Sequence, residues 1–245
     1  MMIAGTATVQ QRTQRPKRIH AQATRMHLLE VAERLFAEHG IEGASLRAIS
    51  LAAGQSNSVA AQYHFGNKIG LIEAIFQMRT PEVEKRRAAL LDKMKGKDAL
   101  PDIRTLVEVL FLPLTQMVEL DGRNIYARFL QHFLSDSNLL AIRSHPLGRQ
   151  RLGLPSDGNS ATYSAVEMMV RQLPNIPEIV VRDRIVIQLR SFLGALLHWE
   201  AAQKFDKHPW PFEIMVTDQL DGIATVISMP VSSAVKDHFS AIALL

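Results

Sequence analysis

The sequence predicts an all-α protein that has a small N-terminal helix-turn-helix domain and a larger C-terminal helical bundle, with about nine helices in total. Apolar residues recur three and four positions apart along much of the 245-residue chain, which is the period of an amphipathic helix. Cap-forming residues precede many of these stretches, and glycine or proline follows several of them. No segment shows the alternation of apolar and polar residues that is typical of a β-strand.

The first helix is expected to begin at Thr24 and to end at Gly40. Thr24 is a suitable N-cap because its hydroxyl accepts a hydrogen bond from a free backbone N–H. Gly40 suits the position after the helix, since glycine adopts a left-handed conformation without a Cβ clash. The apolar stripe between them consists of Leu28, Leu29, Ala32, Leu35 and Phe36.

Two further short helices complete the predicted N-terminal domain. Ser45 is the expected N-cap of the second helix, and Gly54 ends it. A polar turn then leads to a third helix from about Ser58 to Tyr63. Two short helices joined by a glycine turn form the helix-turn-helix pattern, whose second helix enters the DNA major groove. Asn67 is expected to cap a long fourth helix.

Basic residues are concentrated in the N-terminal part of the chain. Residues 1–95 hold 14 Lys/Arg and 8 Asp/Glu, a net charge of +6, and the remainder carries −2, which together give the overall +4. We expect residues 1–20 to form a basic, disordered arm that contacts phosphates or a minor groove, or else remains a solvated tail. The basic residues up to position 25, where no acid occurs, are Arg12, Arg15, Lys17, Arg18 and Arg25.

The segment 24–76 resembles the N-terminal domain of the TetR family of transcriptional repressors. The resemblance is carried by the stretches LLEVAERLFAEHG, SLRAISLAAG and QYHFGNKIGLIEAIF. Its most diagnostic part is YHF at 63–65, with Lys68 three residues further on. The turn before YHF holds one residue more than in most members, and the rest of the chain resembles the family only in its layout.

The resemblance implies contacts with DNA phosphates. In the family, the tyrosine and the histidine of the YHF motif and the lysine after it commonly hold phosphates, which here implies Tyr63, His64 and Lys68. Ser45 suits a phosphate for a physical reason, because a helix N-terminus presents free N–H groups to an anion. The alternative for His64 is a capping or packing role.

Sequence-specific contacts are expected from polar residues in and around the turn. Asparagine and glutamine suit adenine edges, and serine suits either type of base. Arg47 is expected to contact a base or a phosphate. The alternative for Gln62 is plain solvent exposure. The expected base-reading residues are Gln55, Ser56, Asn57, Ser58 and Gln62.

We expect a DNA-binding domain over residues 21–76 and a ligand-binding and dimerisation domain over 77–245. The expected helices of the larger domain span about 67–95, 101–119 with a kink at Pro113, 124–134, 162–173, 177–205 and 211–228, and 135–160 is expected to be loop with one short helix. The last two helices carry enough apolar surface for a four-helix dimer interface, as in the TetR family, or for an intrachain core. Their apolar faces comprise Ile185, Gln188, Leu189, Phe192, Leu193, Leu196 and Leu197 on the first, and Leu220, Ile223, Ala224 and Ile227 on the second.

The resemblance also implies a small-molecule pocket inside the C-terminal bundle, and the apolar character of its candidate residues favours a hydrophobic effector. The alternative is that these side chains are ordinary core. The candidates for the pocket lining are Tyr126, Phe129, His132, Phe133, Met168, Met169, Phe192 and Trp199.

The resemblance implies a homodimeric repressor that leaves a palindromic double-stranded DNA operator when a ligand binds. An activator or a ligand-independent DNA-binding factor is the alternative. An enzyme that uses the helical cavity is a remote one, because the chain has no G-x-S-x-G, P-loop or H-E-x-x-H motif. We expect no catalytic residue, cofactor or metal site. Without a signal peptide or a long apolar run, the expected location is the cytoplasm, with no membrane contact.

Overall fold

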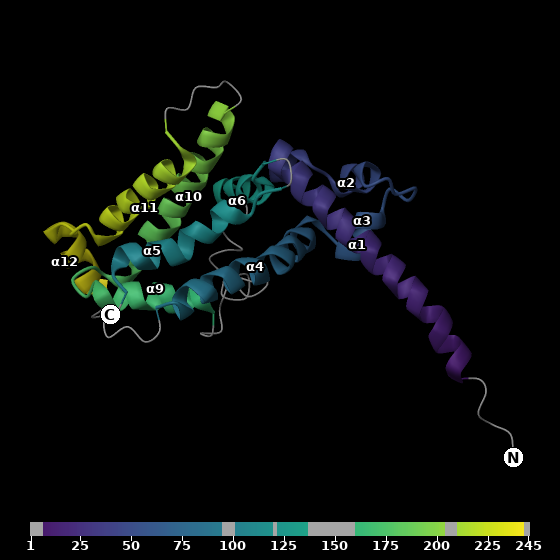
Figure 1. The fold of residues 1–245 in the computed structure, drawn as a ribbon, viewed down its shortest axis with the longest axis horizontal. Coiled ribbons are helices and arrows are strands. Elements are labelled where there is room, and N and C mark those ends of the chain that lie inside the picture. The colour runs from purple at the N-terminus through teal and green to yellow at the C-terminus, as the bar shows by residue number, and fades with distance from the viewer. Residues whose placement is uncertain (1–6, 95–100, 120–121, 137–159, 204–209, 243–245) are drawn as a thin grey trace, which may run out of the picture. The chain divides into compact units, whose positions relative to one another are not determined.

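The computed structural model describes residues 7–94, 101–119, 122–136, 160–203 and 210–242, and every regular element in these ranges is a helix (Figure 1). The all-α prediction is confirmed, with ten α-helices and one 3₁₀-helix in the described ranges. The elements are α1 (Ala7–Gly43), α2 (Leu46–Ala52), α3 (Ala60–Phe65), α4 (Lys68–Asp92), α5 (Ile103–Phe111), η1 (Leu112–Gln116), α6 (Ile125–Ser135), α9 (Ala161–Gln172), α10 (Glu178–Gln203), α11 (Phe212–Ser228) and α12 (Ser233–Ile242).

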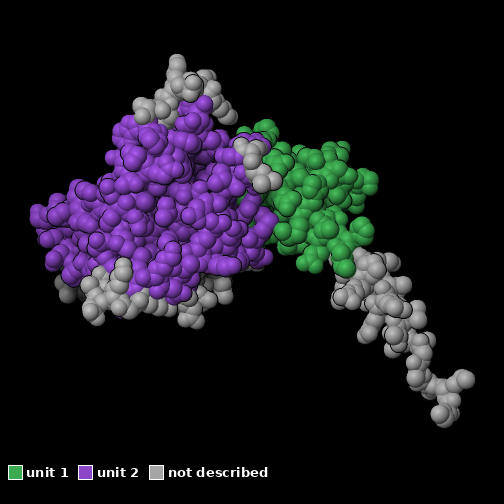
Figure 2. Space-filling model, in the orientation of Figure 1, with its two compact units in different colours: residues 1–75 green, residues 76–245 purple. Residues whose placement is uncertain are grey.

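The chain divides into two compact units, residues 1–75 and residues 76–245 (Figure 2). The first unit packs α1 against α2 and α3 and includes the first turns of α4. In the second unit α5 packs against α9 and α11, while α10 packs against α6 and α11. Each unit has its own apolar core, as compact units require.

Helix α1 begins at Ala7, which differs from the expectation of a disordered arm over residues 1–20 with a helix starting at Thr24. Net charge does not prevent helix formation here, because Ala, Gln, Arg and Lys are good helix formers. Once a helix is nucleated, each added residue gains a hydrogen bond without a new nucleation cost. The predicted end is confirmed, since Gly40 has a φ of 74° and interrupts the helical backbone.

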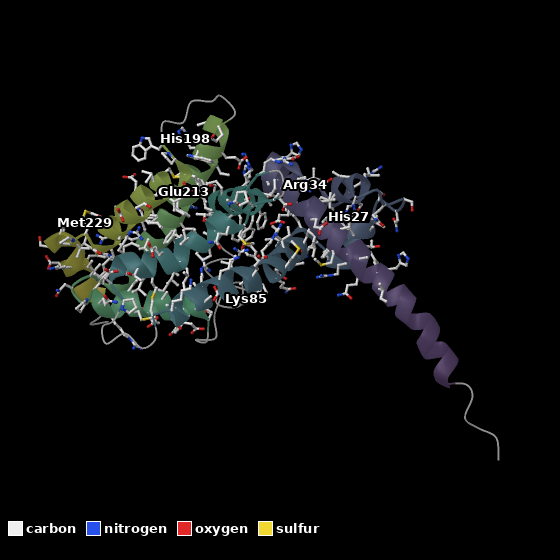
Figure 3. All side chains as sticks on the ribbon, in the orientation of Figure 1. His27, Arg34, Lys85, His198, Glu213 and Met229 are labelled. Carbon is white, nitrogen blue, oxygen red and sulfur yellow. The ribbon has the colours of Figure 1, made fainter. Side chains whose placement is uncertain are left out.

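The predicted stripe of α1 supplies much of the core of the first unit. Leu28, Leu29, Ala32 and Phe36 are all buried, and Ile41 folds back into the same core after the break at Gly40. His27 and Arg34 lie on the exposed surface of α1 (Figure 3).

The capping signals in this unit are largely confirmed. Ser45 Oγ accepts a hydrogen bond from the backbone N–H of Ala48 at 3.1 Å and caps α2. Asn67 Oδ1 accepts from the N–H of Gly70 at 2.9 Å and holds the start of α4. Gly54 and Gly66 adopt φ values of 67° and 75° at the ends of α2 and α3, which is the left-handed region that glycine tolerates.

The second unit also follows its caps. Asp102 accepts from the N–H of Thr105 and begins α5, and Asn124 Oδ1 accepts from Ala127 and begins α6. The expected kink at Pro113 takes the form of a change from α5 to the 3₁₀-helix η1 at Leu112. Helix α12, which the sequence analysis missed, follows α11, while most of the expected loop at 135–160 lies outside the described residues.

A half-buried ion pair on α4 joins three helices of the second unit. Arg87 pairs with Glu84 at 3.0 Å and donates to the carbonyl of Leu110 near the end of α5 at 2.7 Å. Arg87 also donates to Thr162 Oγ1 at the start of α9, and Glu84 accepts from the backbone N–H of Thr162. A cation therefore faces a helix C-terminus and a carboxylate faces a helix N-terminus, as both helix dipoles favour.

Replacing Asp102 tests the cap of α5. Hydrogen bonds from the side chain and backbone of Thr105 hold the pKa of Asp102 below its ordinary value. The carboxylate therefore stabilises the fold above its unfolded-state pKa, and this contribution is lost as the pH falls through the lowered pKa of the folded state. We expect Asp102→Ala to lower the free energy of unfolding by about 1 kcal/mol at neutral pH.

Urea unfolding of the wild type, Asp102→Ala and Asp102→Asn at a series of pH values measures this effect. Asparagine keeps an acceptor but does not titrate, so the stability of the wild type should fall relative to Asp102→Asn in acid. A difference between these two proteins that does not change with pH would contradict the role given to the carboxylate.

Candidate nucleic-acid interface

A buried serine fixes α3 relative to α2. Ser50 is fully buried, and its hydroxyl donates to the carbonyl of Leu46 at 2.9 Å. The same oxygen accepts a hydrogen bond from the backbone N–H of Ala61 at 2.9 Å. One side chain thus joins the two helices of the helix-turn-helix through buried hydrogen bonds, which are costly to break. The sequence analysis missed Ser50, although a lone polar residue beside Ile49 on the buried face of α2 was the available signal.

The turn between the helices is held by its own side chains. Gln55 Nε2 donates to the carbonyl of Ala53 at 3.3 Å, and Asn57 Oδ1 accepts from the N–H of Val59 at 3.1 Å. Helix α3 starts at Ala60, two residues later than expected, and Asn57 and Val59 belong to the turn before it. The predicted readers Gln55, Ser56, Asn57 and Ser58 therefore lie in the turn that precedes α3.

Helix α3 presents three of the predicted contact residues. Gln62 is exposed, and Tyr63 is 84% exposed although it is a large aromatic side chain. His64 is half-buried, and its ring lies edge-on to that of Tyr63 with 5.3 Å between the centroids. Phe65, the last residue of α3, is half-buried. These side chains present hydrogen-bonding groups around one short helix.

Two predicted residues lie at the start of α2. Ser45 is exposed, and only the acceptor side of its hydroxyl is used by the cap, which leaves its proton for a partner. Arg47 is exposed two residues further on, in the first turn of α2. Both side chains face solvent beside a helix N-terminus, where backbone N–H groups attract anions.

Lys68 performs a structural task that the sequence did not reveal. Its Nζ donates to the carbonyl of Ile41 at 2.9 Å and lies 3.3 Å from Glu42 Oε2. The start of α4 is thereby tied to the chain just after the break in α1. An ammonium group has three donors, so this arrangement leaves one for a phosphate.

The eight candidate ligand-binding residues fall into separate parts of the second unit. Tyr126, Phe129 and Phe133 stack along α6, where Phe76 completes the cluster at 4.9 Å from Phe133. Phe192 packs against Phe111 instead, with 5.5 Å between ring centroids.

The other four candidates differ in exposure. Trp199 packs against Phe212 at 4.7 Å, and its Nε1 donates to the carbonyl of Trp210. Met169 is fully buried and Met168 half-buried, whereas His132 is exposed. The eight side chains thus do not converge on one point.

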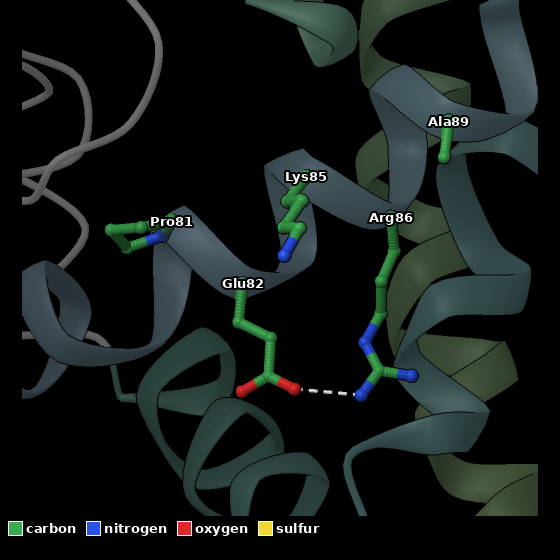
Figure 4. Close-up of a pocket in the computed structure, with 5 residues that line it drawn as sticks. All are labelled: Pro81, Glu82, Lys85, Arg86 and Ala89. Atoms are coloured by element: carbon green, nitrogen blue, oxygen red, sulfur yellow. Dashed lines mark hydrogen bonds and ion pairs between the residues drawn. The ribbon is translucent and has the colours of Figure 1, made fainter.

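A cavity of about 550 Å³ opens beside α4 instead (Figure 4). Its described lining consists of Pro81, Glu82, Lys85, Arg86 and Ala89, none of which is among the eight candidates. Arg86 pairs with Glu82 at 2.6 Å and also donates to Gln116. The pKa of Glu82 is lowered from its ordinary value, chiefly by the hydrogen bond from Arg86.

No group of three or more His, Cys, Asp or Glu residues in the described ranges is placed to hold a metal ion. Among the same residues, no helix is both long and apolar enough to cross a membrane.

Comparison with known proteins identifies the N-terminal segment. Residues 28–75 match the family described as bacterial regulatory proteins, tetR family. The chain is 32% identical over 139 residues to the HTH-type transcriptional repressor AcnR of Corynebacterium diphtheriae, covering 54% of this chain and 71% of that protein. It is 27% identical over 191 residues to the HTH-type transcriptional regulator AcrR of Shigella flexneri, covering 76% of this chain and 83% of that protein.

The fold has a counterpart among solved structures. A chain from Shewanella sp. PV-4, assigned to the tetR family of transcription regulators, superposes with a TM-score of 0.54 at 16% sequence identity. The superposition covers 82% of this chain and 96% of that one. At this identity the likeness concerns the fold.

Removing the hydroxyl of Ser50 tests the link between α2 and α3. Ser50→Ala leaves the buried N–H of Ala61 without its acceptor, and we expect the free energy of unfolding to fall by about 1–3 kcal/mol. Ser56→Ala, in the exposed turn, is the matched control and should change stability by less than about 0.5 kcal/mol. Chemical denaturation compares the two variants, and equal effects would show that the buried bond is unimportant.

Proposed function

The chain belongs to the TetR family of bacterial regulatory proteins, and from this we propose that it is a repressor that binds a palindromic operator as a homodimer and leaves it when a small hydrophobic effector binds. Members of the family are DNA-binding transcriptional regulators, which are not enzymes. The operator, the dimer and the effector are the proposed parts. Residues of the first unit support the operator, and residues of the second unit support the dimer and the effector.

The observation that carries the proposal is the exposure of polar side chains on a short helix that buried hydrogen bonds hold in place. Ser50 fixes α3, and α3 presents Gln62 and Tyr63 to solvent. We assign base recognition to Gln62 and to the turn before α3, since amide groups match adenine edges. Tyr63, His64 and Ser45 are assigned to phosphates, which set the register of the helix on DNA.

Exposed apolar side chains on α10 and α11 support the homodimer. Ile179, Val186 and Ile187 are spaced so that they fall on one face of α10, and each is at least 37% exposed. Ile214 on α11 is 55% exposed, and α11 packs beside α10. Exposed apolar patches of this kind mark interaction sites.

None of these exposed residues belongs to the apolar faces from which the sequence predicted a dimer interface. Six residues of those predicted faces are buried in the core of the second unit because α5, α6, α10 and α11 pack together there. The proposed interface therefore uses the exposed apolar side chains of the two helices instead of these buried ones. The six buried residues are Phe192, Leu193, Leu196, Leu220, Ile223 and Ile227.

The effector is proposed to act where α6 and α10 pack together. Six of the eight candidate residues lie on these two helices, which are rich in aromatic rings. Within the described part of this interface, Gln131 Oε1 and Arg190 Nε are buried without a hydrogen-bond partner. Buried polar atoms of this kind call for a partner, and a ligand with a polar group would supply one.

Release from DNA follows from linkage between the two binding events. A ligand shifts a conformational equilibrium only by its difference in affinity for the two states. We therefore propose that the effector prefers a state in which the two copies of α3 do not match the half-site spacing of roughly 34 Å.

A DNA-binding selection tests the proposed function. Purified protein is used to enrich sequences from a random duplex pool, and its affinity for the recovered sequence is compared with that for a scrambled duplex at fixed salt. Recovery of a palindrome that the scrambled duplex does not displace supports the proposal. Equal affinity for both duplexes would contradict sequence-specific repression, and failure of every small molecule to release DNA would favour a ligand-independent factor or an activator.

Tyr63→Phe and Gln62→Ala separate phosphate contacts from base contacts. Loss of the Tyr63 hydroxyl should weaken binding to the operator and to its point variants by the same factor, about tenfold, because a hydrogen bond to a charged phosphate is lost. Gln62→Ala should instead change the ranking of the point variants. Fluorescence anisotropy measures both, and a selective loss in Tyr63→Phe would show that its assignment is wrong.

Ile187→Glu tests the proposed dimer interface. A carboxylate at this position is tolerated in a solvated monomer, whereas two copies buried against each other would cost several kcal/mol. We expect the variant to sediment as a folded monomer and the wild type as a dimer. Ile69→Glu is the control, since Ile69 is also exposed but lies on α4 in the first unit. A dimeric Ile187→Glu variant would place the interface elsewhere.

A further inference from the structure

An arginine of α1 lies against the aromatic residue that ends α3. The Cζ atom of Arg25 is 5.0 Å from the ring centroid of Phe65 and lies over the ring. Phe65 in turn lies 6.1 Å from the ring of its neighbour His64, and His64 lies 5.3 Å from the ring of Tyr63. A permanent positive charge from α1 therefore lies beside the end of α3, the helix that carries the exposed Tyr63.

No carboxylate neutralises this charge within the part of the chain that the structure describes. None of the ion pairs there includes Arg25, and the first acidic residue of the sequence is Glu30. Glu30 itself lies 3.9 Å from His27 on the same helix. The guanidinium of Arg25 is thus held against an aromatic ring and forms no ion pair with a carboxylate of the described residues.

The geometry of a stacked guanidinium suits a phosphate. An aromatic ring covers one flat face of the group, while its N–H donors point outward in the plane. These donors match two oxygens of a phosphate in a bidentate arrangement. The ring also limits the motion of the side chain, so less conformational entropy is lost when the phosphate binds.

We propose that Arg25 is a DNA phosphate-binding residue and that Phe65 positions its guanidinium at the end of α3. The proposal rests on the proposed function and adds to it a contact from α1, outside the helix-turn-helix. It also gives the half-exposed Phe65 a role as the platform for Arg25.

A purely structural role for Arg25 predicts a different outcome, because the aliphatic stem of an arginine also covers apolar surface. Arg25→Met keeps a flexible apolar side chain over Phe65 and removes the charge. Arg34→Met is the matched control on the same helix. Arg34 is exposed (Figure 3). It lies nine residues further on, which is two and a half turns of helix and therefore the opposite side of α1.

The experiment measures binding constants by fluorescence anisotropy over a series of salt concentrations. The probes are the duplex recovered by selection and a scrambled duplex of equal length. Arg25→Met should lower the slope of log K against log salt by about 0.9 for each bound subunit, since one fewer counterion is released. It should weaken binding to operator point variants by a common factor of about tenfold. The thermal unfolding temperature should fall only slightly, because one cation–π contact is lost. Arg34→Met should keep the slope of the wild type.

The proposal would be overturned if log K of the wild type depended on log salt and Arg25→Met showed the same slope. A loss confined to one point variant would also overturn it, because that result indicates a base contact. If the wild type bound neither duplex, the proposed function itself would fail. Arg25→Gln, which keeps a polar planar end group without the charge, provides the same measurement if the methionine variant does not fold.

Discussion

The position of α3 depends on the hydroxyl of Ser50, which donates to one helix and accepts from the other. Helix α3 contains only six residues, too few to be stable by itself, and its N-cap residue Val59 makes no side-chain cap. Its shape must therefore come from tertiary contacts, and Ser50 supplies a buried, directional one. The exposed residues on α3 are positioned by this hydrogen bond and by the packing of the buried alanines of α3.

Sequence reasoning succeeded where one residue determines a local structure. Ser45 and Asn67 were identifiable as caps because each satisfies a backbone group a few residues away. Gly40 was identifiable as a helix end for the same local reason, and its φ of 74° agrees.

Sequence reasoning failed where distant residues or competing local signals decide the outcome. The extension of α1 to Ala7 follows from helix propagation, which the density of positive charge concealed. The expected start of α3 at Ser58 is two residues too early, because residues 58 and 59 belong to a turn in which Asn57 accepts a hydrogen bond from Val59. The pairing of Arg25 with Phe65 joins residues forty positions apart, so no motif contains it. The division of the apolar residues of α10 between core and surface likewise depends on the packing of neighbouring helices.

Helix α4 begins in the first unit and continues into the second. Each of its two parts is held by different contacts. Lys68 ties its first turn to the end of α1, while Glu84 and Arg87 tie its later turns to α5 and α9. Both anchors are charge-assisted hydrogen bonds, which are among the stronger polar contacts.

The central claim is that α3 reads the DNA major groove, and methylation interference on the selected duplex tests it most directly. Guanine N7 lies in the major groove and adenine N3 in the minor groove, so one reagent that methylates both atoms probes both grooves. The account predicts that methylation of N7 blocks binding in two clusters separated by about one helical turn, while methylation of N3 between them does not. Interference at N3 alone, or none at N7, would contradict it.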